Sequence, residues 1–104
     1  MTLHDLVADK LERADAASRA ALLLIPLDNI DRWIANGHTA PQRLEQWRQI
    51  ILRARESSEG FQELLDLLRD RSAATERLRD FAPFAGVLTA AERAVVIRQC
   101  AYSH

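Results

Sequence analysis

Few side chains in this sequence combine residue types and spacings that could do chemistry. Cys100 and His104 lie four residues apart, a spacing that would place a thiolate and an imidazole on one helical face as two zinc ligands. A structural zinc ion needs four ligands, and the other histidines, His4 and His38, lie far away along the chain. We therefore expect no metal site, and a buried Cys100 instead.

Catalytic motifs are equally sparse. His4 and Asp5 are adjacent and could form an acid–base couple, but the start of a helix is usually solvated. The three glycines stand far apart, which argues against a phosphate-binding loop. An acidic run from Glu56 to Asp70 predicts the solvated side of a helix, with attraction of a basic partner as the alternative. We expect no enzyme activity and no cofactor.

Composition restricts the class of partner. Fourteen basic residues nearly cancel fifteen acidic ones, so no overall field attracts the chain to nucleic acid or to an anionic membrane. A single cysteine allows no internal disulfide, and the first residues lack the pattern of a secretory signal. The longest apolar run, residues 20–25, is far too short to span a bilayer. We expect a cytoplasmic protein without membrane contact.

The elements that would position these residues are all predicted to be helices. Apolar residues recur at spacings of three and four, and no segment alternates as a half-buried strand does. The sequence therefore predicts an all-α fold, a compact orthogonal bundle of six to seven short helices in a single domain over residues 1–104.

Helix ends are predicted from caps and breakers. Capping boxes are expected where a threonine precedes an acid or amide by three residues, at Thr2, Thr39 and Thr89. Pro26 is expected to separate a short helix over 19–24 from another over 28–36, which ends at Gly37. Between Phe81 and Leu88, a proline and a glycine predict a non-helical connector.

Residues 18–37, SRAALLLIPLDNIDRWIANG, resemble a helix-turn-helix of the phage-repressor (Cro-like) family. The resemblance rests on Ala20 in the first helix, Ile25 in the turn, and Ile30 and Trp33 in the second helix. The chain departs from the family pattern at Leu24, where a glycine is usual. The resemblance covers 20 of the 104 residues, and the whole chain resembles no family.

The resemblance implies a second helix that reads bases in the major groove of DNA. The exposed positions would be Asp28, Asn29, Asp31 and Arg32, two of which are acidic and would be repelled by phosphates. The possible DNA-contacting residues are Asn29, Arg32, Arg43 and Arg48. The alternative is that Ile30, Trp33 and Ile34 are simply the buried side of a helix pair.

The aromatic connector has two interpretations as well. Phe84, Val87 and Leu88 either plug the core or, if exposed, form a protein interface.

The favoured function is a non-enzymatic regulatory or adaptor protein that binds another protein, with a homodimer as one form of it. Two tryptophans and thirteen arginines supply the residue types that anchor interfaces. The alternative is a helix-turn-helix transcriptional regulator that binds DNA, or a small antitoxin-like protein.

Overall fold

A computed structural model describes residues 2–37 and 40–95. Within these ranges every regular element is helical and there is no strand, which confirms the all-α class. Residues 90–95 are also helical. The five complete helices are α1 (Leu3–Arg13), α2 (Ala16–Ala35), α3 (Pro41–Glu56), α4 (Ser58–Arg69) and α5 (Ala73–Asp80).

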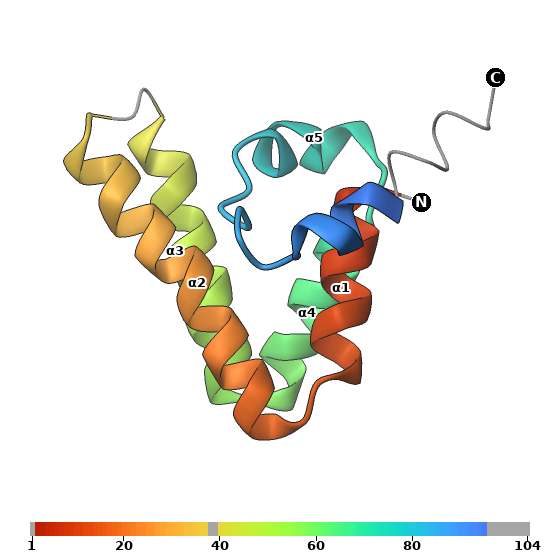
Figure 1. The fold of residues 1–104 in the computed structure, drawn as a ribbon. Coiled ribbons are helices and arrows are strands. Elements are labelled where there is room, and N and C mark those ends of the chain that lie inside the picture. The colour runs from red at the N-terminus through yellow and green to blue at the C-terminus, as the bar shows by residue number, and fades with distance from the viewer. Residues whose placement is uncertain (1, 38–39, 96–104) are drawn as a thin grey trace, which may run out of the picture.

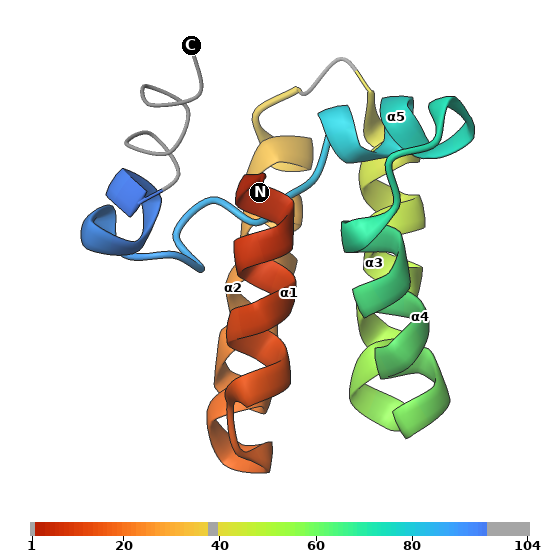
Figure 2. The same ribbon diagram turned by 90° about the vertical axis from the view of Figure 1, so that its right-hand side faces the viewer.

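The first four helices form two layers, α1 with α2 and α3 with α4 (Figure 2). Helix α3 packs against both α2 and α4, and α4 packs against α1. Helices α1 and α2 meet at their shared turn and then diverge, so that this layer has the shape of a V (Figure 1). Helix α5 and the connector lie at the wide end of the V.

The core lies between the two layers. Its centre is Trp47 on α3, which is fully buried and whose ring contacts Phe84 edge-on at a centroid distance of 5.3 Å. Each large apolar side chain that folding removes from water contributes roughly 1.5–3 kcal/mol. The other fully buried large aliphatic side chains come from α1 to α4 and the connector: Leu11, Leu23, Ile30, Leu44, Ile51, Leu64, Leu65, Leu68 and Val87.

The predicted break at Pro26 is wrong, because α2 continues through this residue. Helix α2 is one helix of 20 residues that contains Pro26 in its interior, and residues 25–27, expected to separate two helices, are helical. An interior proline removes one backbone hydrogen bond and costs about 3 kcal/mol. Pro26 is fully buried, with Leu23 and Ile30 buried on the same side of the helix, so packing of that side offsets the cost.

Several predicted ends are confirmed. Thr2 and Asp5 exchange both hydrogen bonds of a capping box, as do Thr89 and Glu92. Gly37 follows α2 with a φ of 78°, the left-handed conformation that glycine tolerates. The predicted cap at Thr39 lies outside the described residues, and Ala40 holds the N-cap position of α3.

Candidate protein-binding site

The burial of the connector decides between its two predicted roles, a plug of the core or a protein interface. Phe84, Val87 and Leu88 retain only 7%, 2% and 7% of their surface exposure, so they belong to the core. They are buried because α1 and α2 diverge and leave apolar surface between them that the connector covers (Figure 1). These three side chains are therefore not a free docking patch.

Polar side chains of the helices hold the backbone of this connector. Asn29 on α2 donates both N–H groups of its amide, to the carbonyls of Pro83 at 2.9 Å and Ala85 at 2.8 Å. Lys10 on α1 donates to the carbonyl of Val87 at 2.8 Å. The connector makes few backbone bonds of its own, so these donors satisfy carbonyls that burial would otherwise leave unpaired.

The four residues predicted to contact DNA do not form one basic surface. Asn29 is 2% exposed and its amide oxygen accepts from Arg32, so it cannot reach a base edge. Arg48 pairs with Asp31 at 2.8 Å and with Glu45 at 3.2 Å. Arg32 is exposed and Arg43 partly exposed. Asp31 on α2 and Glu45 on α3 can both pair with Arg48 because the two helices pack side by side.

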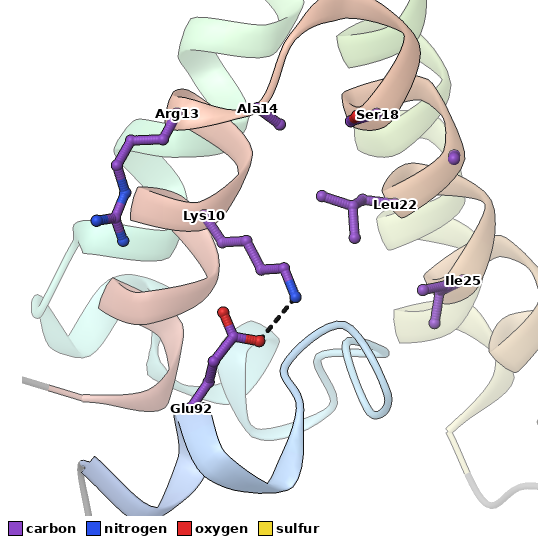
Figure 3. A pocket seen from close by; sticks show the side chains of 8 residues that line it. Lys10, Arg13, Ala14, Ser18, Leu22, Ile25 and Glu92 are labelled. Carbon is purple, nitrogen blue, oxygen red and sulfur yellow. Dashed lines mark hydrogen bonds and ion pairs between the residues drawn. The ribbon is translucent and has the colours of Figure 1, made fainter.

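An open groove occupies the narrow part of the V, between the end of α1 and the first half of α2 (Figure 3). Its volume is about 700 Å³. Leu22 and Ile25 extend from α2 toward α1, and the ion pair between Lys10 and Glu92 crosses the end nearest the connector. We call this the α1–α2 groove. Its lining residues are Lys10, Arg13, Ala14, Ser18, Ala21, Leu22, Ile25 and Glu92.

The Lys10–Glu92 pair closes one end of the groove. The two charges lie 2.7 Å apart, and Glu92 also accepts from the Thr89 N–H at 2.8 Å. The hydrogen bond from Lys10, followed by that from Thr89, lowers the pKa of Glu92, so its carboxylate stays ionised at neutral pH. The groove thus has a fixed polar end and apolar walls.

The outward side of α2 next to this groove is largely apolar over its first half. Ala17, Ala21, Leu24 and Asp28 follow at spacings of four, three and four, which places them on one side of the helix. All four are exposed, and Leu24 retains 46% of its surface exposure. We call these four residues the outer face of α2. Together with the groove it is the candidate site.

His4 and Asp5 do not form an acid–base couple. Asp5 accepts from the Thr2 N–H at 2.8 Å and pairs with Arg71 at 2.6 Å. Burial, followed by the charge of Arg79, lowers the pKa of His4. A neutral histidine whose neighbouring acid is engaged elsewhere lacks the orienting partner of a general base.

The metal hypothesis concerns residues mostly outside the described ranges, namely His38, Cys100 and His104. Among residues 2–37 and 40–95, no group of three or more histidines, cysteines or acids is arranged to hold a metal ion. None of the described helices combines the length and apolar character needed to cross a membrane.

No protein-family model, curated protein or solved structure matches the chain. The resemblance of residues 18–37 to a Cro-like helix-turn-helix therefore stays a prediction, and the continuous α2 lacks the turn on which it was based.

Sequence reasoning missed the outer face of α2 because it divided that helix at Pro26. The signal was present in the apolar run of residues 20–25. Had the helical pattern been continued through Pro26, Leu24 would have fallen with Ala17 and Ala21 on a side of the helix turned away from Leu23 and Ile30.

Proposed function

We propose that this chain is a non-enzymatic regulatory or adaptor protein that binds a protein partner through the outer face of α2 and the α1–α2 groove. The observation that carries the proposal is the 46% exposure of Leu24 beside a groove walled by Leu22 and Ile25. Ala21 belongs both to the outer face and to the lining of the groove, so the two adjoin along the helix. Exposed apolar surface that extends beyond single residues marks interaction sites more often than isolated exposed residues do.

The charge around the site also suits a protein partner. Within residues 2–37 and 40–95, neither Arg13 nor Asp28 is in an ion pair, and they lie toward opposite ends of the site. Unpaired charges at the rim of an apolar patch are typical of protein interfaces, where they set orientation. DNA binding is not proposed, because Asn29 and Arg48 are engaged within the chain.

A pair of matched variants tests the proposal. Leu24→Asp places a charge on the outer face of α2, whereas Leu3→Asp changes a leucine of equal exposure, 45%, on α1. In affinity capture from the native host, we expect a partner that Leu24→Asp loses and Leu3→Asp retains. If no protein depends on Leu24, the proposed function is wrong.

A further inference from the structure

We propose that a second cavity of the molecule binds a small apolar carboxylic acid in its anionic form. The cavity lies between the start of α1 and the connector and has a volume of about 260 Å³. We call it the α1–connector cavity. The inference goes beyond the proposed function, because the residues that line this cavity are neither on the outer face of α2 nor in the α1–α2 groove.

The walls of the α1–connector cavity are largely apolar. Leu3 and Val7 are four residues apart on one side of α1, and Phe84 and Leu88 line the cavity from the connector. Leu3 retains 45% of its surface exposure, so part of this apolar wall is in contact with water. An apolar ligand that covers it would be bound by the hydrophobic effect.

The polar side chains of the cavity leave one positive charge without a partner. The two ionisable residues in the lining are His4 and Arg93, and no aspartate or glutamate is among the described residues there. Within residues 2–37 and 40–95 the guanidinium of Arg93 is in no ion pair, and the imidazole of His4 makes no hydrogen bond. The cavity therefore favours an anion.

His4 adds a hydrogen-bonding group without a second charge. Burial, followed by the charge of Arg79, lowers the pKa of His4, so its imidazole is neutral at pH 7. A neutral imidazole has one N–H donor and one acceptor nitrogen. The cavity thus offers a ligand one full positive charge and one neutral donor.

This set of groups matches a monocarboxylate. A guanidinium donates two parallel hydrogen bonds to a carboxylate, and the single negative charge balances that of Arg93. A phosphate ester carries nearly two negative charges at neutral pH, one more than the lining balances. Apolar walls with a few polar groups are typical of sites for small molecules.

The volume limits the size of the acid. A water molecule takes about 30 Å³ of liquid, so 260 Å³ corresponds to roughly ten non-hydrogen atoms. Octanoate, a straight-chain acid of about this size, is therefore the probe. A ligand with so few atoms binds weakly, and we expect a dissociation constant on the order of 0.1–1 mM.

Titration of the full chain with octanoate, followed in amide NMR spectra, tests the site. We expect saturable shifts at Leu3, Gly86 and Arg93, and none at Ala21 or Leu24. Octanol lacks the charged head and acetate lacks the apolar body, so each should bind at least about tenfold more weakly than octanoate. Octanol that binds as tightly as octanoate would overturn the proposal.

Two charge variants test the role of Arg93. Arg93→Gln should weaken octanoate binding about tenfold, because the carboxylate loses its charged donor. Arg55→Gln removes the same charge from an exposed residue beside the first turn of α2 and should leave the dissociation constant within about twofold. Equal effects of the two variants would show only a general attraction to positive charge and would contradict the site.

Two leucine variants test the apolar wall. Leu3→Asp adds a carboxylate to the cavity lining and should weaken octanoate binding about tenfold or more, whereas Leu24→Asp on α2 should leave it within about twofold. Aspartate is favourable in the first turn of a helix, so Leu3→Asp should remain folded, which circular dichroism checks.

The outcomes separate this inference from the proposed function. Leu3→Asp should lose octanoate and keep the protein partner, and Leu24→Asp should do the reverse. No saturable binding up to about 10 mM octanoate, or shifts confined to the α1–α2 groove, would overturn the cavity as a ligand site. Capture of a partner through Leu24 would still support the proposed function in that case.

Discussion

At the scale of single residues, Asn29 has the most demanding role in the molecule. It is the only buried polar or charged side chain in the described part of the chain, and all of its amide hydrogens are used. Its two carbonyl partners lie on a connector that has little backbone hydrogen bonding of its own. Asn29 therefore fixes the connector on α2.

Replacing Asn29 by alanine should destabilise the protein by about 2–4 kcal/mol, because the buried carbonyl of Pro83 and the partly buried carbonyl of Ala85 both lose their donor. The cost is roughly 1–3 kcal/mol for a buried group and less for a partly exposed one. Urea unfolding followed by circular dichroism measures the change. Asn36→Ala is the control, since Asn36 is exposed at the end of the same helix. Equal losses in the two variants would contradict a special role for Asn29.

The sequence predicted hydrogen bonds between residues a few positions apart and missed those between residues far apart along the chain. The capping boxes at Thr2 and Thr89 were predictable because both partners lie within three residues. Asn29 was assigned to DNA instead, because its carbonyl partners lie 54 and 56 residues away and no local pattern indicates them.

At the scale of elements, the close packing of α3 and α4 depends on Gly60. A Cβ atom built on Gly60 would overlap the backbone carbonyl of Arg53. Backbone atoms cannot move aside as a flexible side chain can. Glycine in the first turn of α4 therefore allows the two helices to approach each other directly after their junction at Ser57.

Gly60→Ala should destabilise the protein by about 1–3 kcal/mol, the usual cost of overpacking. The direction of this change in stability is informative, because replacing glycine by alanine inside a helix ordinarily stabilises a protein by about 0.5–1 kcal/mol. Ser58→Ala, an exposed change in the same turn, is the control and should stay within about 0.5 kcal/mol of the native protein. Increased stability of Gly60→Ala in thermal unfolding would show that the contact is not limiting.

The prediction for α2 failed at this same scale. A proline inside a helical pattern usually marks an end, and the cost of continuing the helix is a local quantity. The compensation is not local, because it comes from burial of Pro26 within a core that other helices complete. The sequence pattern therefore indicates the cost of an interior proline but not the burial that offsets it.

At the scale of the whole molecule, the V formed by α1 and α2 decides which apolar residues are exposed. Its wide end takes up the connector, so Phe84, Val87 and Leu88 are core residues. Its narrow end stays open as the α1–α2 groove. The all-α class followed from periodicity alone, whereas the division between core and candidate site depends on the divergence of two helices, which periodicity does not describe.

The pKa shifts of ionisable groups in different parts of the molecule predict that the free energy of unfolding decreases in acid. The folded state holds the pKa of His4 below its ordinary 6.5. At a pH between the pKa of His4 in the folded state and that in the unfolded chain, the unfolded chain therefore binds a proton that the native protein does not. Stability is therefore full above pH 6.5 and falls as the pH decreases. Hydrogen bonds from Lys10 and Thr89 likewise lower the pKa of Glu92 below 4.5. The pKa values of Asp5, Asp15 and Asp70 are lowered as well, so these four carboxylates together add a second loss as the pH falls through the acid range.

Free energies of unfolding in urea from pH 8 to pH 3 would resolve the two steps. His4→Gln should flatten the decline that begins near pH 6.5, because glutamine takes up no proton in the unfolded chain. Glu92→Gln should keep that decline and reduce the loss below pH 4.5. Each variant is thus a control for the other, because each should change the stability in one pH range and leave it unchanged in the other. A native protein whose stability is constant from pH 7 to pH 5.5 would mean that His4 is not held neutral by its surroundings.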